Sequence, residues 1–272
     1  MSIVNFIPTV WEKELLTQFR GIAVANLITT APTRVEGGKA IFNKVSGGTI
    51  KDYTGTVDYD ELATAPIELT YDIKKYWGIT LDDVDAVQAA APLLSTVAGE
   101  KALDLKEAID GLVFAKAVDS VTSANTIGSK SAKKAITAPE QAYDFIVDLG
   151  TKLSKKKVPM ASRFVCASAE FIDLLAKDKR FCDNFNVLPN GIVQGATING
   201  MTIIQTEDAP ANTVICLHKS AIGFATEMDK VEAIRLQNSF ADAVRGLQVS
   251  GLEALRPEGI AVLYYEVSEA QA

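Results

Sequence analysis

The sequence is poor in the residues that carry most enzyme chemistry. It has a single histidine, His218, and three cysteines, Cys166, Cys182 and Cys216, with no C-x-x-C pair among them. An odd number of widely spaced cysteines argues against a disulfide framework and against a structural zinc site, and it fits a reducing compartment. A serine or cysteine nucleophile activated by histidine would have to use His218. We therefore expect no metal and no cofactor.

The chain also lacks a basic surplus and a membrane segment. It has 27 Lys and Arg against 34 Asp and Glu, a net charge of -7. Proteins that bind nucleic acid by neutralising phosphates usually carry a basic surplus, so sequence-independent DNA binding is not the expected activity. The N-terminus has no basic segment followed by an apolar run, so it is not a signal peptide. No stretch has the apolar length needed to cross a bilayer, and we expect no membrane partner.

The remaining motifs favour structural roles over binding sites. Asp82, Asp83 and Asp85 resemble a cation cluster, but the glycine and distal glutamate of a calcium loop are absent. Acidic residues of this kind are more typical of the start of a helical turn. The lysines at 155–157 are typical of a solvated helix end, and the glycines between 191 and 200 do not match G-x-G-x-x-G. These patterns do not favour catalysis.

What the chain does have is the composition of a folded protein with both helices and strands. Hydrophobic residues make up 48% and charged residues 22%, which is enough for a sizeable core. Residues 67–81 alternate apolar and polar side chains, which predicts a strand. Before it, residues 34–66 hold short runs separated by glycines and few large apolar side chains. This segment cannot form a core alone, so we expect a long hairpin that projects and packs on another subunit.

The clearest element is a long amphipathic helix over residues 92–121. Pro92 suits its first turn, and at 1.5 Å per residue the helix would be on the order of 40 Å long. Apolar residues recur at helical spacing, and the acidic residues are expected on the opposite, solvated side. The expected apolar stripe is Leu94, Val97, Ala98, Ala102, Leu105, Ile109, Leu112 and Val113, and the expected acidic side is Glu100, Asp104, Glu107 and Asp110.

The two ends of the chain add further elements. At the N-terminus we expect a helix over 9–19, then an extended arm that lies on the body or on a neighbour. After a polar connector at 120–137, the patterns predict a helix from Pro139, a buried strand with Cys166 and a second helix. A glycine-rich hairpin and closing strands follow. The last two strands flank residues 257–259.

Several segments, taken in order, resemble the major capsid proteins of tailed bacteriophages. The run L-T-Y-D-I-K-K-Y-W-G-I-T-L-D-D-V-D-A-V-Q at 69–88 looks like the stretch that joins the extended loop to the long helix in that family. The glycine hairpin at 191–200 is similar to one in the apical domain. Other similar segments are 50–53 and 59–62 in the loop, 218–223, and the closing strands at 244–263.

This resemblance implies the Hong Kong 97-like fold, an α+β fold with long reaching elements. The expected parts are an N-terminal arm at 1–33, an extended loop at 34–66, a peripheral domain at 67–125 and 226–272 with a spine helix at about 92–121, and an apical domain at 126–225.

The same resemblance implies a structural protein that is not an enzyme. The chain would assemble with itself, as hexamers and pentamers, into an icosahedral head that encloses double-stranded DNA without sequence-specific binding. A portal and a separate scaffolding protein are expected partners, and the location is the virion, with the host cytoplasm during assembly. Aromatic residues of the loop are the inter-subunit contact candidates: Phe42, Tyr53 and Tyr59.

Three alternatives remain open from the sequence. An encapsulin-like nanocompartment would share the fold but enclose cargo enzymes. A tail or decoration protein would be a different structural role. A cytosolic α/β enzyme would require a pocket with converging titratable groups.

Overall fold

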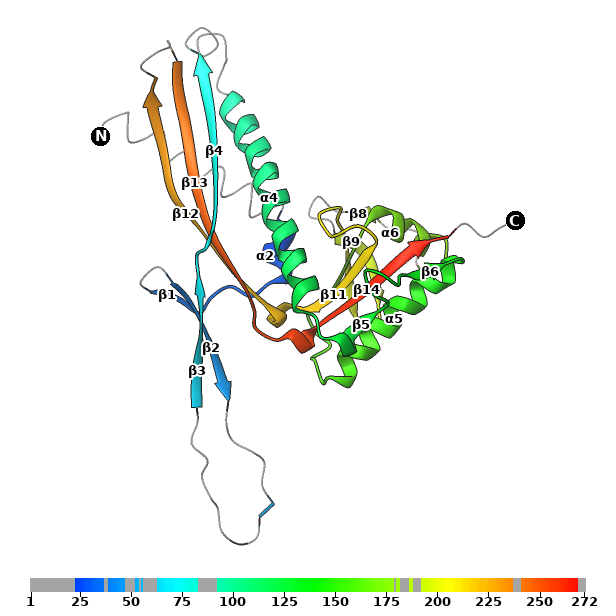
Figure 1. Cartoon of the computed structure of the whole chain (residues 1–272). Helices are drawn as coiled ribbons and strands as arrows, with labels where there is room; N and C mark the ends of the chain where they lie inside the picture. The colour runs from blue at the N-terminus through cyan, green and yellow to red at the C-terminus, as the bar shows by residue number, and fades with distance from the viewer. Residues whose placement is uncertain are drawn as a thin grey trace.

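The computed structural model describes residues 23–36, 39–46, 52–53, 55, 63–82, 92–178, 180–181, 186–187, 192–236 and 241–268. Within these residues the chain forms a mixed α+β fold with three sheets (Figure 1). The helix predicted at 9–19 lies outside them, as does Tyr59. None of the described helices is long and apolar enough to cross a membrane.

A long antiparallel sheet and a long helix lie side by side in one half of the molecule (Figure 1). The strand order is β12-β13-β4, with bounds β4 Ile73–Asp82, β12 Ile222–Arg235 and β13 Ala241–Ala254. Helix α4 spans Pro92–Ser120, 29 residues, which at 1.5 Å per residue is about 43 Å. The predicted spine helix is therefore confirmed, with Pro92 at its start.

The two faces of this sheet have different environments. Side chains alternate between faces along a strand, and directly paired residues share a face. Trp77 pairs with Gly246, and its face belongs to the core cluster that includes the buried side of α4. Tyr76 pairs with Leu247 on the opposite face, which we call the outer face. By the same alternation Gly251 lies on the outer face.

A second, smaller sheet forms a hairpin that extends away from the body (Figure 1). Strand β1 (Arg34–Glu36) pairs with β2 (Lys39–Ser46), and β2 pairs with β3 (Ala63–Thr70) from Lys39↔Thr70 to Ser46↔Ala63.

The single strand expected over 67–81 is two strands. The strand is interrupted at Tyr71 and Asp72, where the Asp72 N–H donates to the carbonyl of Thr70 at 3.1 Å. Strand β3 belongs to the hairpin and β4 to the long sheet. The alternation continues through the break, so the pattern alone cannot locate it.

The other half of the molecule is built on an eight-stranded sheet within the described residues. Its path is β5-β14-β11-β7-β10-β9-β8, with β6 paired to β14. In β7, Val165 and Ala167 face the core under helices α5 and α6, whereas Phe164 and Cys166 face the core that includes α4. Burial on both faces explains its continuous apolar run. The bounds are β5 Thr126–Ile127, β6 Lys134–Ile136, α5 Pro139–Lys155, β7 Arg163–Ala167, α6 Ala169–Ala176, β8 Asn186–Val187, β9 Ile192–Ile198, β10 Met201–Gln205, β11 Thr213–His218 and β14 Ile260–Val267.

Strand β14 refines the expected division of the chain. It pairs with β11, β5 and β6, which all come from the segment 126–225. Residues 260–267 therefore pack with that segment rather than with the long sheet. The remaining short helices are η1 Ser123–Asn125, η2 Lys219–Ala221 and η3 Pro257–Gly259, the last between β13 and β14 as the sequence predicts.

The described part of the N-terminal arm is partly helical. Helix α2 spans Val24–Ile28, where an extended arm was expected. It packs against α4, and Thr30 then forms a parallel bridge with Gly223 of β12. The short helix forms because its N-terminal N–H groups find an acceptor on α4, a partner that no local pattern reveals.

Candidate functional site

The geometry around His218 does not suit nucleophilic catalysis. Its Nδ1 accepts the backbone N–H of Ser220 at 3.1 Å and lies 2.8 Å from the Ser220 hydroxyl, so the ring caps η2. Burial lowers the pKa of His218, and the charges of Arg163 and Arg256 lower it further, although a hydrogen bond with the backbone of Ala161 opposes the shift. The general base of a Ser-His-Asp site has a carboxylate on its second nitrogen, whereas the charges that act on this ring are positive.

The described cysteines are also unsuited to chemistry. Cys166 and Cys216 are fully buried on neighbouring strands and carry free thiols. Burial raises the pKa of Cys216 to about 12 and raises the pKa of Cys166 as well. Buried thiols of this kind stay protonated and behave as small apolar side chains. Cys182 lies outside the described residues.

The other sequence candidates do not converge either. Asp83, Asp85 and the side chain of Asp82 lie outside the described part of the molecule. The lysines at 155–157 are exposed where α5 ends, as the sequence predicts. No group of three or more His, Cys, Asp or Glu in the described residues is placed to hold a metal ion. The surface elements are therefore the candidates for function.

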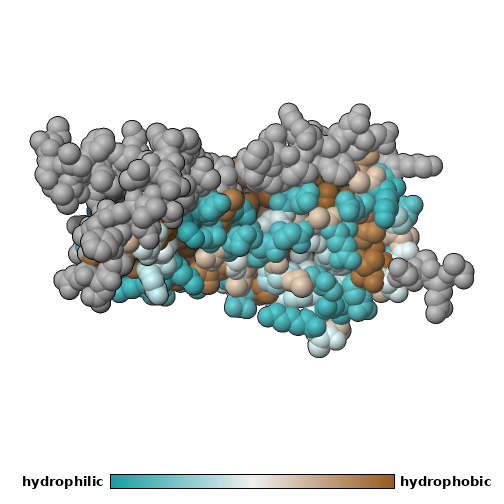
Figure 2. All heavy atoms as spheres, turned by 90° about the horizontal axis from the view of Figure 1, so that it is seen from above, coloured by the Kyte–Doolittle hydropathy of each residue, from teal (hydrophilic) through white to brown (hydrophobic). Residues whose placement is uncertain are grey.

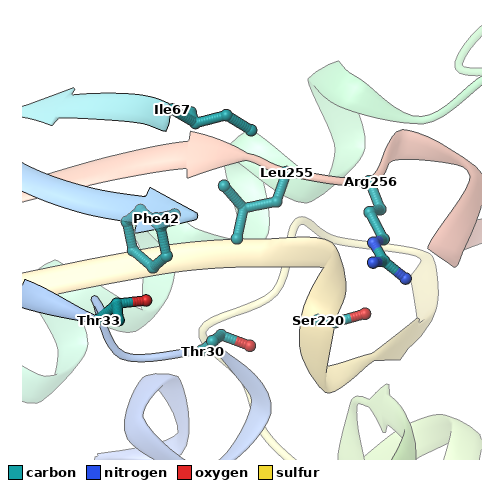
Figure 3. A pocket seen from close by; sticks show the side chains of 7 residues that line it. All are labelled: Thr30, Thr33, Phe42, Ile67, Ser220, Leu255 and Arg256. Atoms are coloured by element: carbon teal, nitrogen blue, oxygen red, sulfur yellow. The ribbon is translucent and has the colours of Figure 1, made fainter. Parts of the chain in front are cut away.

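The first of these surfaces is the base of the β2–β3 hairpin, which lies against β12 and β13. Phe42 and Leu69 are buried there together with Ala40 and Ala225. A cavity of about 170 Å³ beside them is lined by Phe42, Ile67, Leu255 and residues of the arm and η2. Figure 3 shows the side chains of Phe42, Ile67 and Leu255 gathered between the hairpin strands and the sheet.

The structure describes two of the three contact residues proposed from the sequence, and their environments differ. Phe42 is 5% exposed and packs on its own chain, so it offers little surface to a neighbour. Tyr53 is 78% exposed and available for contact. Tyr59 lies outside the described residues. Contact with a neighbouring subunit stays a prediction for these residues.

The second surface is the outer face of the long sheet beyond the hairpin base. Tyr76 is 85% exposed there, beside Gly246 and Leu247. A groove of about 410 Å³ runs along it, bordered by an ion pair in which Arg245 donates to Glu232 at 2.7 Å. Tyrosine and arginine in one groove are the residue types that dominate protein–protein contacts.

Apolar residues are also exposed elsewhere among the described residues, on the face seen from above. There Figure 2 shows hydrophilic and hydrophobic residues interspersed, with brown atoms gathered toward the end that carries β6 and β14. Val267 at the end of β14 is 40% exposed. Singly exposed apolar side chains are normal and need no partner.

The third element is the attachment of the arm to α4. Asp110 accepts the N–H of Val24 at 3.0 Å and of Ala25 at 2.8 Å, so both carboxylate oxygens hold the start of α2. Lys106 pairs with Asp110 at 3.5 Å and also with Asp208. Asp110 was expected on the solvated side of the helix; that expectation is wrong, since it is fully buried.

The charges of this cluster are strongly influenced by one another. Burial raises the pKa of Asp110 above its ordinary value, although the N–H groups of α2 and the ammonium of Lys106 oppose the rise. Burial alone would lower the pKa of Lys106, but Asp208 and Asp110 together raise it. The cluster therefore keeps Lys106 charged and binds the arm to the spine helix.

Apart from Phe42, sequence reasoning did not identify the residues that form these surfaces. The alternation that places Trp77 in the core also places Tyr76 on the opposite face, so Tyr76 could have been identified as a large exposed aromatic residue. Asp110, Gly223 and Gly251 carry no such local signal, because each acts on a segment far away in sequence.

Comparisons with known proteins identify the architecture. No family model matches the sequence, and no curated protein matches it. A solved chain from Mycobacterium phage Che8 is 25% identical, with a TM-score of 0.63 over 84% of this chain and 85% of that chain. The capsid of the cyanophage P-SCSP1u is 16% identical, with a TM-score of 0.64 over 89% of this chain and 87% of that chain.

An encapsulin has the same architecture. The SrpI encapsulin of Synechococcus elongatus PCC 7942 is 13% identical, with a TM-score of 0.58 over 90% of this chain and 89% of that chain. Each of these matches covers more than four fifths of the chain. The chain therefore has the Hong Kong 97-like fold, which these phage and encapsulin structures share.

Proposed function

We propose that this chain is the major capsid protein of a tailed bacteriophage and assembles with itself into the icosahedral head. The observation that carries the proposal is the hairpin, which extends away from the body in a chain that matches capsid subunits over most of its length (Figure 1). An extended segment that cannot bury its own side chains gains stability by lying on a neighbour. Heterologous contacts of this kind close into rings and, with curvature, into shells.

The parts of the subunit take roles that follow from their shapes. We assign the arm to residues 1–33, the extended loop to 34–66, the peripheral domain to 67–125 and 226–259, and the apical domain to 126–225 with 260–272. The rigid body is the spine helix with the two larger sheets, and the arm and hairpin extend from it to contact neighbouring subunits. Many modest contacts per subunit give a stable shell while misplaced subunits can still leave.

The partners follow from the same assignment. The chain would form hexamers and pentamers with itself and would use a scaffolding protein and a portal, with assembly in the bacterial host cytoplasm. A net charge of -7 suits a wall that encloses double-stranded DNA without adhering to it.

The hairpin gives a direct experiment. Ser46 and Ala63 are directly paired, so residues 47–62 can be replaced by a two-residue Asn-Gly turn that fits an antiparallel pair. We expect the shortened protein to fold with an unfolding free energy no lower than that of wild type, because a shorter loop costs less entropy to close. We expect it to form no closed shells by electron microscopy, alone or with a co-expressed scaffold. A variant with 47–62 replaced by an equally long Gly-Ser segment serves as the control for chain length. Normal shells from the shortened protein would contradict the proposal.

An encapsulin-like compartment is the second candidate, because the SrpI encapsulin has the same fold over 90% of this chain. The contents of the shells separate the two functions. Shells that take up DNA in the presence of a portal and a packaging motor support the capsid, whereas shells that enclose a specific enzyme support the compartment.

A further inference from the structure

The hairpin is seated on two glycines of the long sheet. A Cβ atom at Gly223 in β12 would lie 2.7 Å from Cζ of Phe42 and 3.0 Å from its Cε1 and Cε2. A Cβ atom at Gly251 in β13 would lie 2.2 Å from Cδ2 of Leu69 and 2.4 Å from the carbonyl oxygen of Thr70. Real Cβ atoms do not approach other heavy atoms this closely, so both positions require glycine while the hairpin keeps its place.

Each strand of the hairpin has its own seat. Phe42 belongs to β2 and Leu69 to β3, and they lie on neighbouring strands of the sheet. Both side chains are at least 95% buried. Two separate contacts on two strands fix both the tilt and the roll of the hairpin, because neither movement can occur without lifting one side chain from its glycine.

The contact at Gly251 includes backbone. The carbonyl of Thr70 accepts the N–H of Asp72 in the break between β3 and β4, so it cannot rotate away as a side chain can. A methyl group at position 251 must therefore move the hairpin itself. At about 3.3 Å per residue an eight-residue strand is about 26 Å long, so a tilt of about 5° moves its far end by about 2 Å.

We propose that Gly223 and Gly251 are positioning residues that set the tilt of the hairpin relative to the sheet, which we call its pitch. The pitch in turn sets the angle between neighbouring subunits. The inference rests on the proposed function, since the hairpin transmits its pitch only where it contacts a neighbour. A methyl group at either position changes the pitch. The diameter of the shell, or its closure, then changes while the subunit remains folded.

The experiment compares Gly223→Ala and Gly251→Ala with Gly111→Ala. Gly111 lies in α4, away from the outer face, and an added Cβ there would meet only the carbonyl oxygen of Asp208 at 3.8 Å, an ordinary contact, so its alanine variant is the control. Unfolding free energies are measured on subunits, and shell diameters are measured by electron microscopy. Wild type and Gly111→Ala should give the same closed shells, and the other two variants should give shells of a different diameter or open sheets.

A second substitution that removes the clash distinguishes a changed hairpin pitch from a general loss of subunit stability. The clash at position 223 involves the tip of the Phe42 ring, so Phe42→Leu in the Gly223→Ala background removes the colliding atoms and should restore the wild-type diameter. Wild-type diameters in both single alanine variants would overturn the proposal, as would loss of folding in both. Failure of the wild type itself to form shells would instead refute the proposed function.

Discussion

At the scale of single residues, the hydrogen bonds and neighbouring charges of His218 define its role. It is the only histidine of the chain, and its Nδ1 must stay unprotonated to accept the N–H of Ser220. Protonation would place a donor against a donor and a positive charge near Arg163 and Arg256. The role of the ring is thus to end β11 and begin η2, where asparagine would serve as well.

This environment predicts the pH dependence of stability. Burial lowers the pKa of His218 in the folded state, so the unfolded chain binds a proton near pH 6.5 before the folded chain does. Its contribution to stability is present above pH 6.5 and is lost as pH falls through the lower folded value. Urea unfolding between pH 7.5 and 5 should show wild type losing stability relative to His218→Asn. Parallel curves for the two proteins would contradict the assignment.

At the scale of elements, the sequence predicted the helices and strands that can be identified from the spacing of their own apolar residues and from their turn residues. The spine helix, α5 and the hairpin around Asn199 and Gly200 follow from spacing and turn residues. The break at Tyr71 and Asp72 could not be predicted, because period two continues across it. Helix α2 could not be predicted either, since the group that stabilises its first turn comes from α4. Gly223 and Gly251 could not be identified as contacts of the hairpin for the same reason. A glycine in the sequence does not indicate which distant segment packs against it.

The attachment of α2 to α4 by Asp110 gives an element-scale prediction. Asp110→Ala leaves the buried N–H groups of Val24 and Ala25 without their acceptor, at a cost of about 2–4 kcal/mol in unfolding free energy. Amide hydrogen exchange should also become faster through 24–28. Asp104→Ala on the same helix is the control, because the Asp104 side chain is 64% exposed and its pair with Lys101 contributes at most about 0.5 kcal/mol. Equal effects of the two variants would mean that Asp110 does not hold the arm.

At the scale of the whole molecule, the outer face of the long sheet has two halves with different occupants. Near β3 it carries the chain's own hairpin, with Leu69 on Gly251. Farther along β4 the same face is open, with Tyr76 85% exposed above the groove between Leu247 and the Glu232–Arg245 pair. The half near β3 already binds an extended segment, the chain's own hairpin. The open half around Tyr76 is therefore suited to bind a segment of a second copy.

Tyr76→Ser tests this arrangement in the assembled state. Tyr76 contacts little within its own subunit, so the unfolding free energy of the subunit should change by less than about 0.5 kcal/mol. A buried tyrosine anchor at an interface contributes about 2 kcal/mol or more, so the protein concentration at which shells appear should rise about thirtyfold or more, measured by light scattering. Lys75→Ser, on the neighbouring and also exposed residue of the opposite face, should leave that concentration unchanged. If Tyr76→Ser assembles at the wild-type concentration, the open half of the outer face is not a contact between subunits.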